Sequence, residues 1–273
     1  MTREEKEIQK YIDEVEDTRI YAMDEATRED RKYVQLLLAA VLTYKINGKT
    51  FRFSDYPEIK SKAMSFLYEY RESLYAGLIK RFTEVIEISI KKNKTLYGFE
   101  SDLPSNTAKK FISSELYDKT TKQRLSGYVD KILYEVEAYV SAGTAAGLSN
   151  KAIIDEYFTY MKKPFASPLI QKAIAKGDFN AIRLASKGVH FGTGISTSSL
   201  INIRSVVQDS IQNAFQFSEK EIYNYNGVKG YTIHRGSSYD CPICNYLPGK
   251  TYPMTEWILP AHPRCCCFSI PVV

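Results

Sequence analysis

The most informative pattern in this chain lies in its C-terminal segment, Tyr231 to Val273, which reads YTIHRGSSYDCPICNYLPGKTYPMTEWILPAHPRCCCFSIPVV. All five cysteines of the chain and two of its three histidines lie in this segment. A CxxC pair, Cys241 and Cys244, is followed after seventeen residues by HPRCCC, which begins at His262. Thiols that only fill a core would be spread over the whole chain. The clustering therefore predicts a local chemical role.

The spacing of these residues is typical of a structural zinc site. Zinc takes four nitrogen or sulfur ligands in a tetrahedron, and a CxxC turn places two thiolates on one side of the metal at about 2.3 Å. His262 can supply the second pair together with Cys265 or Cys267. Two ligand pairs in zinc modules are usually separated by roughly 15 to 20 residues, which this sequence matches. We predict a zinc site made of Cys241, Cys244, His262 and Cys265, with Cys267 as the alternative fourth ligand.

Other uses of the thiols and histidines remain open. Three consecutive cysteines cannot all face one metal, so at least one is surplus. The CxxC could be a redox pair, although no βαβ pattern surrounds it. A cysteine nucleophile with His262 or His234 as its base is a further alternative, without a local motif to support it. We expect His190 to be a loop or packing residue, and His234 to be a partner of Asp240 beside the metal.

Composition indicates an ordinary globular protein. The chain has 273 residues, of which 44% are hydrophobic and 25% charged, and its net charge of +5 is a mild basic excess. The charged N-terminus lacks the apolar core of a signal peptide, and the longest apolar run, Val34 to Leu42, is too short to cross a bilayer. We expect a cytoplasmic chain with no membrane partner, in which an odd number of cysteines favours metal ligation over disulfides.

Upstream of the cysteines, apolar residues recur at the three- to four-residue spacing of amphipathic helices. Ser149 and Ser198 or Ser199 stand where helix N-caps are expected. A run of small residues, SAGTAAG at 141–147, allows close helix contact or ends a helix. The predicted helices cover residues 2–42, 57–92, 129–140, 149–163, 169–175, 180–186 and 198–223.

Two segments favour β structure instead. Tyr44 to Phe53, YKINGKTFRF, has Asn47-Gly48 between alternating apolar residues, which predicts a hairpin. Val228 to Arg235 reads as a strand that leads into the CxxC. The predicted fold class is mainly α (α+β): a multi-helix body with a small hairpin near residues 44–53 and a small, β-rich, zinc-knuckle-like module at 228–273.

The C-terminal pattern resembles the motif of the phage Mu F-like minor head proteins, also called phage head morphogenesis proteins. That family pattern is a CxxC, a glycine turn and a terminal HPxCxC. The matching residues here are CPIC at 241–244, LPGK at 247–250, and His262, Pro263, Cys265 and Cys267. Cys266 stands where the family commonly has arginine. We therefore divide the chain into a helical N-terminal region, 1–150, and a minor-head-protein-like region, 151–273.

This resemblance implies a low-copy structural protein of tailed-phage heads rather than an enzyme. Such a protein acts with portal and capsid proteins during head assembly, and in some relatives it travels with the DNA, which makes DNA a further partner. The implied location is the virion or procapsid, after assembly in the host cytoplasm.

Two functions from different classes compete with this one. Ser196-Thr197-Ser198 and Glu219-Lys220-Glu221 mimic the STS and ExE signatures of ADP-ribosyltransferases, although the segment between them reads as one helix instead of strands. A zinc-containing nucleic-acid-binding module is the second competing function. The net charge of +5 and the basic residues near His262 permit it, and its binding would weaken steeply with salt.

Overall fold

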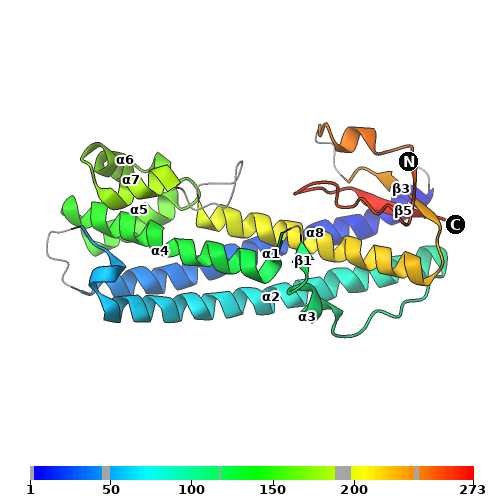
Figure 1. Cartoon of the computed structure of the whole chain (residues 1–273), viewed down its shortest axis with the longest axis horizontal. Coiled ribbons are helices and arrows are strands. Elements are labelled where there is room, and N and C mark those ends of the chain that lie inside the picture. The colour runs from blue at the N-terminus through cyan, green and yellow to red at the C-terminus, as the bar shows by residue number, and fades with distance from the viewer. Residues whose placement is uncertain (1–2, 45–49, 117, 188–197, 237–239) are drawn as a thin grey trace. The chain divides into compact units, whose positions relative to one another are not determined.

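The computed structural model describes residues 3–44, 50–116, 118–187, 198–236 and 240–273. The predicted mainly helical fold is confirmed, because eight α-helices account for most of this part of the chain (Figure 1). Their bounds are α1 Arg3–Leu42, α2 Pro57–Tyr97, α3 Thr107–Phe111, α4 Thr121–Ala145, α5 Asn150–Tyr160, α6 Pro168–Ala175, α7 Phe179–Lys187 and α8 Ser199–Tyr225.

The described strands form two small antiparallel sheets. The first pairs β1 (Glu115–Leu116) with β2 (Lys119–Thr120). The second has the order β4-β3-β5, in which the central strand β3 (Gly230–His234) pairs with β4 (Thr251–Pro253) and β5 (Phe268–Val272). This second sheet is the β-rich C-terminal module that the sequence predicts. Its strands bring the chain around the CxxC and the chain around HPRCCC to the same place.

The chain folds into two compact units, each assembled from separate stretches of sequence. Unit 1 consists of Met1–Asp24, Ala76–Thr121 and Ser205–Val273, and unit 2 of Glu25–Tyr75 and Lys122–Arg204. The boundary that we place at residue 150 from the sequence differs from this division. The reason is that α1, α2 and α8 each contribute residues to both units, which a linear reading of the chain cannot show.

Unit 1 contains the C-terminal module together with parts of the three longest helices. Its segments of α1, α2 and α8 bury the apolar faces that the periodicity predicts, including Val15, Phe82 and Phe215. Lys92 of α2 and Glu219 of α8 form an ion pair in which both side chains are fully buried. Glu219 also accepts hydrogen bonds from Ser89 at 2.5 Å and Asn93 at 2.7 Å, which satisfy its buried oxygens.

Unit 2 is built around the long apolar face of α4. Ile132, Val136 and Val140 of this helix are completely buried. Where α4 reaches the small-residue run, a Cβ placed on Gly143 would lie 2.4 Å from Ile153 of α5, so glycine is what allows the two helices to approach. The run therefore serves both predicted purposes, since α4 ends at Ala145 in the same segment.

Local signals at the helix ends act as the sequence predicts. Ser149 Oγ accepts a hydrogen bond from the amide of Ala152 at 3.2 Å, and Ser198 Oγ accepts one from the amide of Ile201 at 3.3 Å. Each serine thus satisfies an amide that the first helical turn leaves without a partner. The described helices include none that is long and apolar enough to cross a membrane.

The predicted hairpin at 44–53 is not seen in the part of it that the structure describes. Its turn, Asn47-Gly48, lies outside the described residues, Thr50 to Arg52 carry no strand, and Phe53–Asp55 is a 3-10 helix. Phe51 and Phe53 both point into unit 2, where their rings meet edge to face at 5.1 Å. The alternating apolar residues that suggested a strand are therefore anchors of a connecting segment.

Candidate metal centre

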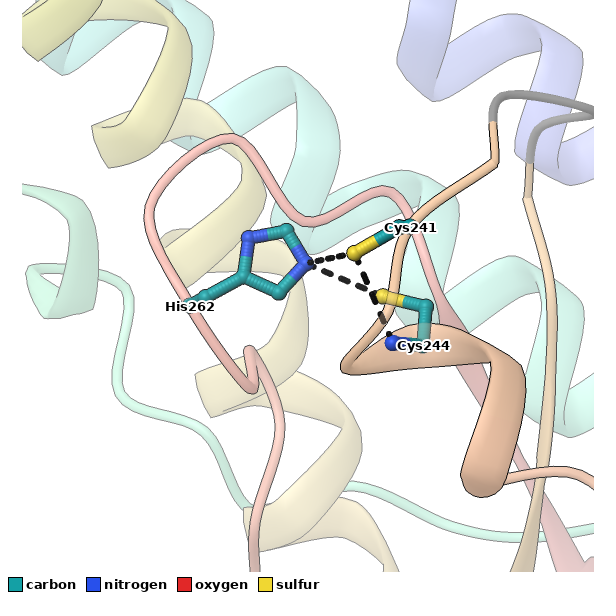
Figure 2. Close-up of side chains that lie close together, drawn as sticks. All are labelled: Cys241, Cys244 and His262. Carbon is teal, nitrogen blue, oxygen red and sulfur yellow. Dashed lines mark hydrogen bonds between the residues drawn. The ribbon is translucent and has the colours of Figure 1, made fainter.

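The CxxC residues lie in a tight turn that follows β3. The 3-10 helix η3, Cys244–Tyr246, begins at the second cysteine. The amide of Cys244 donates a hydrogen bond to Cys241 Sγ at 3.5 Å, and the amide of Asn245 donates one to the Cys241 carbonyl at 2.9 Å. These bonds wrap the backbone around the first thiol. Both sulfurs consequently point to the same side of the turn (Figure 2).

His262 reaches the two sulfurs from the opposite segment of the module (Figure 2). Its Nε2 lies 3.3 Å from Cys241 Sγ and 3.0 Å from Cys244 Sγ. Its other ring nitrogen, Nδ1, lies 2.7 Å from the carbonyl oxygen of Pro263. Because a carbonyl only accepts, Nδ1 carries a hydrogen, and Nε2 is the ring nitrogen that faces the thiols. This is the orientation that a metal-binding histidine requires.

The remaining ligand candidates form a second, buried group with Cys244. The donor atoms of Cys244, Cys265 and Cys267 all lie within 4.8 Å of one another, as do those of Cys241, Cys244 and His262. The sulfurs of Cys244 and Cys265 are 3.9 Å apart. Two thiolates on one tetrahedral zinc ion would be about 3.8 Å apart. The structure therefore gathers the five predicted donors into two groups of three that share Cys244, and each group could hold a metal ion.

The surroundings of the four thiols shift their pKa values in different directions. A hydrogen bond from Cys267, with help from the backbone amide of that residue, lowers the pKa of Cys265 to about 5 in spite of burial. The same hydrogen bond, together with burial, raises the pKa of Cys267. Burial raises the pKa of Cys244 to about 12, whereas the Cys244 amide lowers that of Cys241. Cys265 is thus the buried thiol that ionises most readily.

The electrostatics of His262 follow from the same neighbours. Burial lowers its pKa, but the hydrogen bond to the Pro263 carbonyl and the negative charge of Cys265 and Cys241 outweigh this effect, and the net pKa is raised. An imidazole beside several thiolates is therefore stabilised as a cation when no other positive charge is present. A metal ion in the cluster would replace that proton.

The surplus thiol is Cys266, which belongs to neither donor group. Its Sγ accepts a hydrogen bond from Arg19 Nη1 of α1 at 3.1 Å. Arg19 is buried and also pairs with Glu16 on the same helix. The cysteine run is thereby resolved: the side chains of Cys265 and Cys267 are buried in the cluster, and the one between them faces α1.

Other side chains of the C-terminal module surround the two donor groups. Tyr252 and Trp257 pack against the buried cluster that contains Cys244, Cys265 and Cys267. The proposed pairing of His234 with Asp240 is wrong, because His234 stacks on Phe268 at 5.8 Å and Asp240 accepts a hydrogen bond from Asn245 at 2.6 Å. On an antiparallel sheet the side chain opposite on the neighbouring strand is closer than a residue in the next loop.

Sequence reasoning missed the residues of α8 that hold the HPRCCC segment. Asp209 accepts a hydrogen bond from the Arg264 amide, and Gln212 and Gln216 both donate to the Cys267 carbonyl. The available signal was a polar stripe at helical spacing opposite the apolar face of α8. Gly236 was missed as well: a Cβ there would lie 1.8 Å from the Cys266 carbonyl, so only glycine permits this approach.

The structure describes Ser198, Glu219, Lys220 and Glu221 of the residues that mimic the ADP-ribosyltransferase signatures, and none of these four belongs to either donor group. Ser196 and Thr197 lie outside the described residues, as does His190. Glu219 and Glu221 both lie on α8, as the helical reading of that segment predicts, and Glu219 is in the buried pair with Lys92.

Comparison with known proteins gives no match among family models, curated proteins or solved structures.

Proposed function

We propose that this chain is a structural protein of a tailed-phage head, which acts with portal and capsid proteins during head assembly, and that zinc holds its C-terminal module together. The observation that carries the proposal is the Cys/His cluster: residues from the turn after β3 and from the segment before β5 meet at one point in unit 1. The same residues carry the resemblance to the minor head proteins.

Zinc is the metal that the donor set fits best. Cys241, Cys244 and His262 would hold it with Cys265, and Cys267 is the alternative fourth ligand. Sulfur and imidazole nitrogen are the ligands that zinc takes in structural sites, and four protein ligands leave no position for a substrate. When bound, zinc supplies a tetrahedral cross-link between two segments of the module.

The small size of the module explains why such a cross-link is useful. Its sheet has strands of five, three and five residues, and β4 pairs with only part of β3. A short sheet of this kind buries little apolar surface by itself. Small modules usually gain the missing stability from disulfides or a metal, and all five cysteines of this chain are free.

The partners are assigned from the resemblance and from the surface. Large aromatic side chains are enriched at protein interfaces. Among the described residues, three tyrosines are more than half exposed: Tyr68 (61%), Tyr225 (55%) and Tyr246 (74%). These side chains suit contacts with portal or capsid subunits in a procapsid or virion. DNA packaged in the same head is a further partner.

Mass spectrometry of purified particles tests this function. Procapsids and virions are isolated from the phage or induced prophage that encodes the chain, and their proteins are identified and quantified. We expect the chain at low copy number relative to the capsid protein, with the portal protein in the same particles. Absence from both particle types would refute the proposed function.

A further inference from the structure

One face of α8 carries polar residues that contact the chain on either side of the candidate ligands. One stripe of the helix contains Ser205, Asp209, Gln212, Gln216 and Tyr223, which follow one another at intervals of four, three, four and seven residues. We call this set the α8 polar stripe. All of it lies in unit 1 with the metal centre. A polar stripe that is partly buried needs partners, because unpaired buried donors are costly.

The partners of the α8 polar stripe are mostly backbone atoms of the C-terminal segment. Asp209 Oδ1 accepts a hydrogen bond from the Arg264 amide at 2.7 Å. The Cys267 carbonyl accepts one from Gln216 at 2.8 Å and one from Gln212 at 3.2 Å. Further along, the hydroxyl of Tyr223 donates to the Ser269 carbonyl at 3.2 Å. The helix therefore holds the backbone on both sides of Cys265.

The backbone at this point needs external support. Arg264 has φ of 63°, in the left-handed region that residues other than glycine rarely adopt. Such a conformation persists where the surroundings determine it. Here Asp209 holds the Arg264 amide, and Ser205 accepts a hydrogen bond from the Arg264 guanidinium at 2.8 Å. The strained residue directly precedes Cys265, so its conformation fixes where that thiol points.

Gln216 shows that the contact is more than packing. Its side chain is almost fully buried, and its Oε1 has no hydrogen-bond partner among the described residues. Burying an amide oxygen without a hydrogen-bond partner is unfavourable. An apolar side chain of the same length would avoid that cost but could not donate to the Cys267 carbonyl. The donor is therefore the function that glutamine provides at this position.

We propose that Asp209, Gln212 and Gln216 are positioning residues for the metal centre, which hold Cys265 and Cys267 in place for the ion. This inference rests on the zinc site of the proposed function. It also requires reciprocity: if α8 favours metal binding by holding the segment, then bound metal favours the docking of the segment on α8 by the same free energy. Zinc thus couples the sheet of the module to the helical part of unit 1.

The test compares zinc affinity in variants of the full chain. Gln212→Met and Gln216→Met, singly and together, keep the side-chain length but remove the donors. Gln208→Met is the matched control, a glutamine on the same helix that makes no hydrogen bond to the described C-terminal segment. Zinc affinity is measured by competition with a chromophoric chelator. We expect the double variant to bind zinc about 10- to 100-fold more weakly than wild type. Removing groups that contact metal ligands typically lowers metal affinity by this factor.

A second measurement separates positioning from general stability. Hydrogen exchange of the β5 amides is followed with zinc bound and after chelation. We expect β5 to lose protection on chelation while α5 of unit 2 keeps it. If the double variant does not fold, the zinc affinities of the two single variants provide the comparison. Equal zinc affinity in Gln216→Met, Gln212→Met and the control would overturn the inference, as would unchanged β5 protection. Failure of wild type to bind zinc would instead refute the zinc site of the proposed function.

Discussion

Cys244 is the residue on which the candidate metal centre depends. Its sulfur belongs both to the half-exposed group with Cys241 and His262 and to the buried group with Cys265 and Cys267. Either choice of fourth ligand therefore includes it. Cys266 shows the opposite case, because the adjacent thiol in the same short run contacts Arg19 and takes no part in either group.

The zinc content of the chain tests whether Cys241 is a ligand. Cys241→Ser removes one thiolate of the ligand set and leaves the buried thiols in place. We expect wild type purified without chelator to carry a single zinc ion per chain and the variant to lose it, because serine is a poor ligand for a soft site. Elemental analysis by mass spectrometry measures the zinc.

Cys266→Ser is the control for this experiment. It also removes a thiol from the HPRCCC segment, but serine oxygen can still accept the hydrogen bond of Arg19. We expect its zinc content to equal that of wild type. Full zinc content in Cys241→Ser, or loss of zinc in Cys266→Ser, would show that the ligand assignment is wrong.

At the scale of elements, the N-terminal part of α8 is tied to α4 by a buried carboxyl group. Glu135 accepts hydrogen bonds from the Ser199 amide at 2.7 Å and from the Tyr157 hydroxyl at 2.9 Å. Asp30 of α1 accepts one from the Tyr70 hydroxyl at 3.1 Å. Burial raises the pKa of both carboxyl groups to about 7, and repulsion from Glu135 adds to the shift at Asp30.

These shifts predict an unusual dependence of stability on pH. The ordinary pKa values of Asp30 and Glu135 are 3.8 and 4.5, so between about 4 and about 7 the folded chain binds more protons than the unfolded chain. The contribution of these groups to the free energy of unfolding is full below that window and is lost as the pH rises through it. The loss is on the order of a few kcal/mol.

Asp30→Asn tests this prediction, because asparagine keeps the shape of the side chain without titrating. Urea unfolding at several pH values between 4 and 8 gives the free energy of unfolding of both proteins. We expect the wild-type value to fall relative to that of the variant as the pH rises, and the difference to level off above about pH 7. Parallel curves for the two proteins would contradict the buried, neutral state of Asp30.

At the scale of the whole molecule, each compact unit combines stretches that are far apart in the sequence. Unit 1 needs Met1–Asp24 and Ala76–Thr121 in addition to the C-terminal stretch. Glu219 of α8 depends on this arrangement, because its buried partner Lys92 comes from α2. Removing one member of a buried ion pair typically costs about 3 to 5 kcal/mol.

We therefore predict that residues 151–273 do not fold independently, although they contain every candidate ligand. The fragment lacks the parts of α1 and α2 that belong to unit 1, so the apolar face of α8 and the carboxylate of Glu219 lose their partners. Thermal unfolding followed by circular dichroism compares the fragment with the full chain at the same concentration. A cooperative transition in the fragment similar to that of the full chain would contradict the division into units that are each assembled from separate stretches of sequence.

Features that depend on neighbours along the chain can be predicted from the amino-acid sequence. Apolar periodicity predicts where the long helices run, and the serines at 149 and at 198 or 199 predict where α5 and α8 begin. The spacing of the cysteines and His262 predicts that they meet, because a turn and a short sheet suffice to bring them together. At 44–53, however, the same rules predict a hairpin where Phe53 begins a 3-10 helix.

Residues that surround the cysteines and His262 but are distant in sequence cannot be predicted in the same way. No spacing rule connects Arg19 with Cys266, or Gln216 with the Cys267 carbonyl, because these hydrogen bonds depend on how helices pack against the sheet. The two compact units are hidden for the same reason: each long helix has one continuous pattern, yet its two ends pack with different partners. Local signals predict most of the helices and the candidate ligands, while packing determines which side chains contact those candidates.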